Sequence, residues 1–182
     1  SNVVVILEEN ARLNVNNTTA FASFRQVEGS MVNISAQKQF TVYGTHEVGH
    51  YAGVNNYGTF NTYSKTFAID YGAFVNNYSE GTWNMYNSAL QVSSSDGSSN
   101  SKSGHVVNYG NINMTNSSLY VSGRFTDVKN EDGAVWIIDN TMSANNKSVV
   151  FDNVEFRVNN NSNQYVSMEC GSAFYVKHSD MT

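Results

Sequence analysis

The stretch EGTWNMYNSALQV, residues 80–92, carries the pattern that decides the fold. An apolar, a polar and an apolar residue at 83–85 are followed by a short polar turn and then by a second apolar pair, Leu90 and Val92. Alternate side chains of a β-strand face opposite sides, so each half of the pattern predicts a short strand with one apolar face.

The first half of this pattern recurs along the chain at intervals of 19 to 44 residues. A degenerate repeat of about 20 to 30 residues with internal alternation is typical of a solenoid. We predict that the outer residues of each copy face the core and that the central residues form one outward column. The six copies are Leu13-Asn14-Val15, Val32-Asn33-Ile34, Phe60-Asn61-Thr62, Trp83-Asn84-Met85, Ile112-Asn113-Met114 and Phe156-Arg157-Val158, with residues 135–138 as a skipped copy.

Two further strands are predicted for each repeat. The next outward column predicted on the first strand is Asn16, Ser35, Tyr63, Tyr86, Thr115 and Asn159. The inward pairs predicted on the second strand are Phe40 and Val42, Phe67 and Ile69, Leu90 and Val92, and Leu119 and Val121. The third strands are predicted at residues 53–55, 73–75, 105–107 and 149–151.

Three short strands per coil predict an all-β chain folded as a parallel β-helix of about six to eight coils. A right-handed winding is the default for parallel crossovers. The alternative is an antiparallel β-sandwich, which needs tight Asn-Gly or Asp-Gly turns, but most of the turns in this chain lack them. We expect one domain over residues 1–182, as a segment of a longer protein.

The composition agrees with stacked strands. Charged residues make up 14% of the chain and there are 27 asparagines and no proline, which suits columns of uncharged side chains in continuous sheet. The net charge of −5 argues against a nucleic-acid partner. No apolar run is long enough to span a membrane, so we expect no membrane insertion.

The segment HEVGHYAGVNN, beginning at His46, resembles the zinc signature of the metzincin proteases. The resemblance implies His46 and His50 as zinc ligands and Glu47 as the base, but Asn56 stands where that family has its third ligand. The motif needs a helix, whereas the flanking residues predict strand and turn. We therefore expect no metal site, with the zinc protease kept as an alternative.

Tyrosines on the outward columns are the candidate binding residues. We predict that Tyr63 and Tyr86 stack on adjacent coils and that Lys38 and Lys65 occupy matching turn positions. Aromatic faces stack on the C–H surfaces of sugars, while amide, hydroxyl and ammonium groups bind hydroxyls and carboxylates. Alternatively, stacked tyrosines only stabilise the sheet. The other candidates are Tyr51, Tyr57, Tyr71 and Tyr78.

The four histidines suggest a pH effect. Their protonation would change the formal charge from −5 to about −1 and would permit contact with an acidic polymer below about pH 6.

Three segments, EGTWNMYNSALQV (80–92), NYGNINMTNSSLYV (108–121) and NYGTFNTYSKTFAI (56–69), resemble the pectate-lyase-like adhesive domain of Gram-positive surface proteins, including serine-rich-repeat adhesins. The resemblance implies a right-handed β-helix, an exported and cell-wall-attached protein, and adhesion to host or plant surface glycans. We expect no catalysis and no cofactor. The first alternative is a β-helix lyase acting on acidic polysaccharide, although such enzymes need clustered carboxylates and the acidic residues here are scattered. A ligand-free structural spacer is another alternative.

Overall fold

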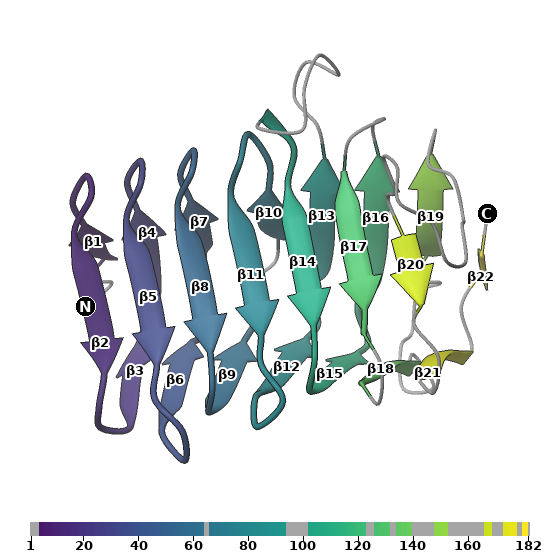
Figure 1. The fold of residues 1–182 in the computed structure, drawn as a ribbon, viewed down its shortest axis with the longest axis horizontal. Coiled ribbons are helices and arrows are strands. Elements are labelled where there is room, and N and C mark those ends of the chain that lie inside the picture. Colours follow the sequence, from purple (N-terminus) through teal and green to yellow (C-terminus); the bar gives the residue numbers. More distant parts are fainter. Residues whose placement is uncertain are drawn as a thin grey trace.

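The computed structural model describes residues 4–63, 66–93, 102–122, 126–131 and 134–139, together with strands at 148–152, 166–168, 173–177 and 180–181. Every paired strand is parallel to its neighbours, and the chain winds from a back sheet to a front sheet and then to a base sheet in each coil (Figure 1). The front and base sheets hold seven strands each, so the predicted all-β solenoid is confirmed.

The strands of the front sheet lie side by side across Figure 1. They are β2 (Arg12–Val15), β5 (Met31–Ile34), β8 (Gly53–Asn56), β11 (Phe74–Asn77), β14 (His105–Asn108), β17 (Asp127–Asn130) and β20 (Val166–Met168).

The base sheet follows the front sheet in every coil. Its strands are β3 (Thr19–Phe21), β6 (Gln39–Val42), β9 (Thr59–Thr62), β12 (Thr82–Tyr86), β15 (Asn111–Thr115), β18 (Val135–Asp139) and β21 (Ala173–Lys177).

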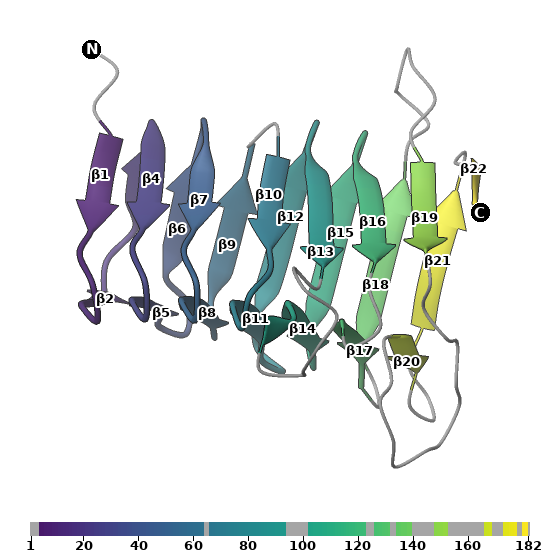
Figure 2. The same ribbon diagram turned by 90° about the horizontal axis from the view of Figure 1, so that it is seen from above.

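The back of the solenoid is divided into two sheets, as Figure 2 shows from above. The first contains β1 (Val4–Leu7), β4 (Ser23–Gln26) and β7 (His46–Val48). The second contains β10 (Thr66–Ile69), β13 (Ala89–Ser93), β16 (Ser118–Ser122), β19 (Ser148–Asp152) and β22 (Asp180–Met181).

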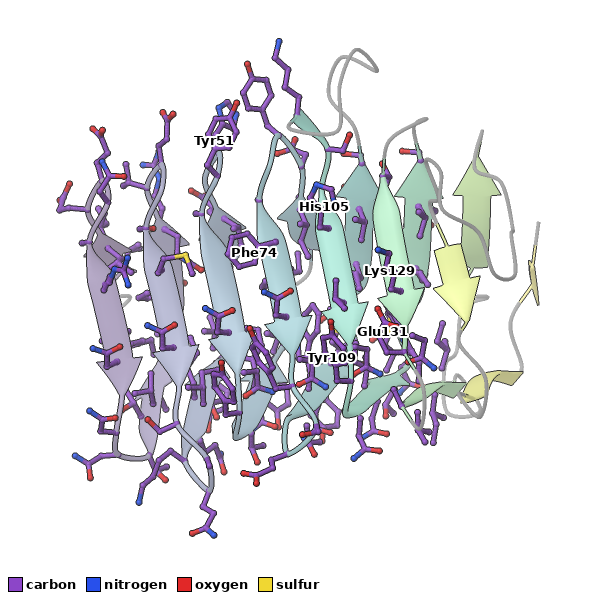
Figure 3. All side chains as sticks on the ribbon, in the orientation of Figure 1. Tyr51, Phe74, His105, Tyr109, Lys129 and Glu131 are labelled. Atoms are coloured by element: carbon purple, nitrogen blue, oxygen red, sulfur yellow. The ribbon has the colours of Figure 1, made fainter. Side chains whose placement is uncertain are left out.

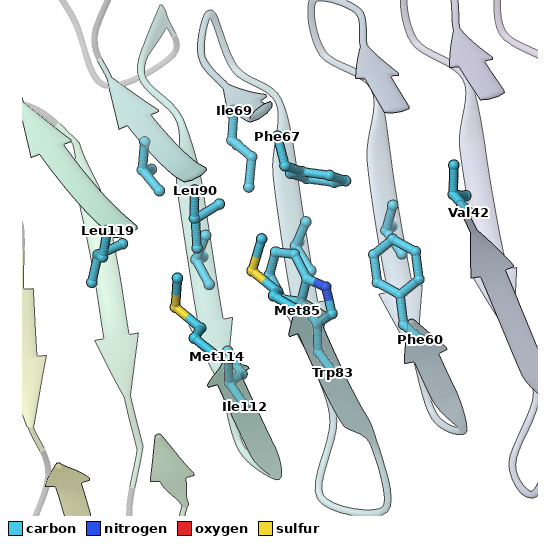
Figure 4. Close-up of a cluster of buried hydrophobic side chains, with 14 of the residues drawn as sticks. Val42, Phe60, Phe67, Ile69, Trp83, Met85, Leu90, Ile112, Met114 and Leu119 are labelled. Atoms are coloured by element: carbon cyan, nitrogen blue, oxygen red, sulfur yellow. The ribbon is translucent and has the colours of Figure 1, made fainter. Parts of the chain in front are cut away.

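The core is a column of apolar side chains that point inward from all three sides (Figure 4). On the base sheet, Phe40, Phe60 and Trp83 stack with ring centroids 5.7 and 5.4 Å apart. Ile112 and Trp136 continue this column by strand pairing, which confirms residues 135–138 as a repeat copy. The predicted inward residues Val15, Val32, Ile34, Phe60, Thr62, Trp83, Met85, Ile112 and Met114 are all buried.

The prediction that the six copies share one sheet is wrong. Asn14 and Asn33 belong to the front sheet, where Asn33 pairs with Asn55. Asn61 belongs to the base sheet, where it pairs with Thr41 and Asn84. The apolar-Asn-apolar pattern occurs in both sheets, so the pattern alone cannot assign a strand to one of them. The copy at residues 156–158 lies outside the described residues.

The same shift affects the predicted columns. Ser35 is followed not by Tyr63 but by Tyr57, because the amide of Tyr57 donates to the carbonyl that precedes Ser35, that of Ile34. Phe40 and Val42 lie on the base sheet, whereas Phe67, Leu90 and Leu119 lie on the back. Residues 149–151 also lie on the back, paired with β16, whereas the other predicted third strands are on the front sheet.

A buried asparagine ladder closes the corner between the front and base sheets. Asn56 donates to Asn77, Asn77 to Asn108 and Asn108 to Asn130, each from Nδ2 to Oδ1 over 2.7 Å. The same amides donate to backbone carbonyls of the turns, such as those of Gly81 and Asn111 for Asn77. Gly81 belongs to this corner because a Cβ there would lie 2.5 Å from the Asn56 carbonyl oxygen. The ladder fixes the turns that lead into the base strands β9, β12, β15 and β18.

Candidate functional site

Tyr43, Tyr63 and Tyr86 form a stack at the end of three consecutive base strands, here called the Tyr63 ladder. The ring centroids are 5.4 Å apart for Tyr43 and Tyr63, and 4.7 Å apart for Tyr63 and Tyr86. The predicted stacking of Tyr63 on Tyr86 is confirmed, whereas sequence reasoning missed Tyr43. Desolvation by the neighbouring rings, followed by the Tyr86 and Tyr43 charges, raises the pKa of Tyr63, so its hydroxyl is protonated at neutral pH.

A second stack, here called the Tyr57 ladder, lies at the start of the base strands. Tyr57 and Tyr78 stack almost parallel, with centroids 4.1 Å apart and an interplanar angle of 6°. Tyr109 continues the stack at 6.1 Å from Tyr78. A side-chain hydrogen bond with Tyr78 raises the pKa of Tyr57, with a smaller contribution from desolvation. Sequence reasoning named Tyr57 and Tyr78 without relating them, and it missed Tyr109.

The two ladders border the outward side of the base sheet, here called the tyrosine-edged face. Its middle row is hydrogen-bonded along the solenoid axis: Asn61 donates to Thr41, Asn84 to Asn61 and Asn113 to Asn84, over 2.9 to 3.2 Å. Over the fully described strands β6, β9, β12 and β15, no outward side chain is charged. These outward side chains are Gln39, Thr41, Thr59, Asn61, Thr82, Asn84, Tyr86, Asn111, Asn113 and Thr115.

The N-terminal end of each ladder carries an aromatic ring next to a small residue. The amide of Tyr43 donates to the carbonyl of Phe21, which places Ala22 before Tyr43 in the column. By the same pattern, Ser35 precedes Tyr57. Tyr43 is 61% exposed, the largest value among the exposed apolar and aromatic side chains of the described chain. The faces of the inner rings are covered by their neighbours, so the ladder ends offer the open faces.

Tyr51 does not join either ladder. It lies at the opposite corner, between the back and front sheets, where it meets Tyr71 edge-on with centroids 5.6 Å apart. His50 stacks on Tyr71 at 4.2 Å, and the Lys102 ammonium lies 5.6 Å from the centre of the Tyr71 ring. The predicted binding tyrosines are therefore divided among three corners rather than gathered at one site.

The prediction that Lys38 and Lys65 occupy equivalent turn positions is wrong, because the strands that follow them belong to different sheets. Lys38 precedes β6 on the base sheet, whereas Lys65 precedes β10 on the back, and these strands pair with β9 and β13 respectively. Lys65 itself lies outside the described residues. Lys38 remains beside the tyrosine-edged face because its carbonyl accepts the amide of Thr59.

The HEVGH segment does not form the helix that a zincin requires. Residues 46–48 form strand β7, with His46 buried and Glu47 exposed on the other side. His46 lies among four phenylalanines and its Nε2 is 2.9 Å from Oε1 of Gln26, while His50 stacks on Tyr71. Across the described part of the chain, no group of three His, Cys, Asp or Glu side chains could hold a metal ion.

Burial lowers the pKa of His46 to about 3. His46 therefore stays neutral throughout the range in which the sequence predicted a change of charge, and it cannot contribute to binding of an acidic polymer near pH 6.

A depression of about 340 Å³ lies near the break between the two back sheets. Its charged and titratable side chains are those of Arg25, Glu28, Glu47, His50 and Asp70. The Nε of Arg25 lies 3.2 Å from Oε2 of Glu47, and both side chains are more than half exposed. A basic side chain and several carboxylates therefore line one concavity here.

Comparison with models of protein families, with curated proteins and with solved structures gave no significant match. No helix in the described residues is long and apolar enough to cross a bilayer. The geometry of the tyrosine-edged face is therefore the basis for a functional proposal.

Proposed function

We propose that this chain is a non-catalytic binding module that contacts carbohydrate of a host or plant surface through the tyrosine-edged face. The observation that carries the proposal is the combination of two tyrosine ladders with an uncharged row of amides and hydroxyls between them. Display on the outside of a cell, as an adhesin, belongs to the same proposal and is supported by the resemblance of the repeats.

The chemistry of the face suits a sugar polymer. Asn61 and Asn84 each use one amide N–H and one oxygen lone pair within the row, and Asn113 uses one amide N–H. A side-chain amide has two N–H donors and an oxygen with two lone pairs, so a donor and an acceptor per coil remain for a ligand. The tyrosine rings add apolar surface that C–H groups can contact. A flat face of this kind offers many weak contacts rather than one enclosing pocket.

A glycan array tests the proposal. The wild-type chain should bind a subset of polysaccharides. Tyr63→Ala and Tyr86→Ala should each weaken that binding by something like 1 kcal/mol, because each removes a ring that supports the next ring of the Tyr63 ladder. Tyr120→Ala is the matched control because Tyr120 is an exposed tyrosine on strand β16 of the back sheet. An array with no bound glycan at neutral and acidic pH would favour a structural spacer instead.

The depression near Arg25 favours a second candidate, a lyase for acidic polysaccharide. A lyase removes the proton at C5 of a uronic acid while the bond from C4 to the leaving oxygen breaks, which leaves a C4–C5 double bond in the product. Arg25 would be the basic residue, with the carboxylates around it. Ultraviolet absorbance during incubation with polygalacturonate should then rise for the wild type and stay flat for Arg25→Ala. Equal traces for the two proteins exclude this reading.

A further inference from the structure

We infer that the ligand of the tyrosine-edged face is an uncharged, extended polysaccharide that lies parallel to the solenoid axis, with the sugar ring at its end turned across the axis and stacked on the open face of Tyr43. This inference rests on the proposed function and specifies its ligand.

The charge distribution selects a neutral ligand. The outward side chains of β6, β9, β12 and β15 carry no charge. The charged residues at the border are Lys38, exposed Glu80 before β12, and Glu131, which follows Tyr109 in the column of the Tyr57 ladder (Figure 3). Two carboxylates against one ammonium, on a chain of net charge −5, disfavour a polyanion. A polycation would find no carboxylate on the face itself.

The periodicity of the face favours a polysaccharide that lies along the solenoid axis. Equivalent side chains on neighbouring parallel strands lie about 4.8 Å apart, so a ligand along the axis meets the same amide or hydroxyl at every coil. A ligand lying across the strands would meet only the two outward residues of one strand, such as Thr59 and Asn61 of β9, and then the tyrosine ladder. Because the asparagine amides all donate toward the N-terminal side, the row also distinguishes the two ends of a polymer.

Only a tyrosine at the end of a ladder has a ring face on which a sugar can stack. Tyr63 has Tyr43 on one face and Tyr86 on the other, so no sugar can stack on it. Tyr43 has Tyr63 on one face and the small Ala22 on the other side. A sugar ring placed against Tyr43 would continue the stack as its next member. Tyr57 next to Ser35 offers a second, equivalent place at the opposite border.

Calorimetric titration of the whole chain tests the inference with two groups of probes. The neutral probes are β-1,4-linked glucan, mannan and xylan oligosaccharides of increasing length, and the charged probes are oligogalacturonates and chitosan oligomers. We expect a neutral series to bind with an affinity that is unchanged between low and high salt. Affinity should rise with length until the ligand spans β6 to β15, about 14 Å, and then level off.

Variants locate the stacking ring. Tyr43→Ala should weaken binding of the neutral ligand about tenfold, Tyr43→Phe should keep it within about twofold, and Tyr120→Ala should leave it unchanged. Full affinity in Tyr43→Ala would overturn the stacking. Binding only to the charged probes, with affinity lost in high salt, would overturn the neutral ligand while the proposed function stands. Failure of every probe and of the glycan array would overturn both.

Discussion

Two asparagine ladders run along the same solenoid and differ in their surroundings. The inner ladder at the front-to-base corner, Asn56, Asn77, Asn108 and Asn130, is buried. The outer ladder on the tyrosine-edged face, Asn61, Asn84 and Asn113, makes the same amide-to-amide bonds, but Asn84 and Asn113 are half-buried and Asn61 is 9% exposed. The residue type and the rung spacing are equal, so the difference lies in what else the amides contact.

The amides of Asn56, Asn77 and Asn108 in the inner ladder use both of their N–H groups within the protein. Asn77 alone donates to Asn108 Oδ1 and to two backbone carbonyls, and it accepts from Asn56. The outer amides keep a donor and an acceptor for solvent or a ligand. The inner ladder therefore stabilises the coil, whereas the amides of the outer ladder can still bind solvent or a ligand.

Removal of one inner amide gives the largest expected effect. Asn77→Ala takes one partner from each of the amide of Asn56, the oxygen of Asn108 and the carbonyls of Gly81 and Asn111. The Asn108 oxygen keeps the amide of Gly110, and the Gly81 carbonyl keeps the amide of Asn111. A buried group left unsatisfied costs about 1 to 3 kcal/mol, so we expect a loss of about 2 to 3 kcal/mol in the free energy of unfolding. Urea denaturation followed by circular dichroism measures it.

Asn33→Ala is the control for this prediction. Asn33 lies in an outward row of the front sheet, donating to Asn14 and accepting from Asn55. Water replaces both partners there, so the loss should stay below about 1 kcal/mol. Similar losses for the two variants would mean that burial does not distinguish the ladders.

His46 is a buried titratable group, so its burial makes the stability of the fold depend on pH. Its folded pKa of about 3 lies below the unfolded value of 6.5, so the unfolded chain binds more protons between these values and acid destabilises the fold. Stability from this group is complete above pH 6.5 and is lost as the pH falls toward 3. At pH 4.5 the loss should be about 2 to 3 kcal/mol, at 1.36 kcal/mol per pH unit.

Unfolding midpoints at pH 7.5 and 4.5 test this for the wild type and two variants. His46→Leu removes the titrating group and should reduce the acid-induced loss by about that amount. His50→Asn changes the exposed histidine that stacks on Tyr71 and should leave the acid-induced loss as in the wild type. An unchanged loss in His46→Leu would show that His46 is protonated in the fold.

The sequence predicted the architecture because the core residues alternate strictly. The repeat places Trp83 and Ile112 in one column, and the structure pairs them. It also marks residues 135–138 as a skipped copy, and the structure shows which of them continues the column, Trp136. The column Asn61, Asn84 and Asn113 was also predicted correctly. Where the pattern stayed within the base sheet, the repeat was sufficient to set the register.

The register failed where the same pattern changed sheets. Asn33 and Asn61 are both flanked by inward residues, and 28 residues separate them, close to the 29 that separate the true neighbours Asn84 and Asn113. Because the turns vary in length, the number of residues between two copies does not show whether they belong to the same sheet. The base strand before Asn61 carries Thr41 instead of asparagine, so its copy, and Tyr43 two residues later, escaped notice. Spacing of 20 residues between Tyr43 and Tyr63 was the available signal.

Asn84→Ala should give the smallest change in stability but a measurable loss of affinity for the neutral oligosaccharide. Asn84→Ala removes the middle of the outer ladder, so the half-buried Asn113 loses its acceptor and Asn61, which is 9% exposed, loses its donor. The free energy of unfolding should fall by about 0.5 to 1 kcal/mol. Affinity for the neutral oligosaccharide should nevertheless fall about threefold to tenfold, because one rung of donors and acceptors is missing from the face.

Asn76→Ala is the control, in the outward row of the front sheet. It should give the same small loss in the free energy of unfolding with unchanged affinity for the oligosaccharide. Equal affinity losses in the two variants would place the ligand elsewhere than on the tyrosine-edged face.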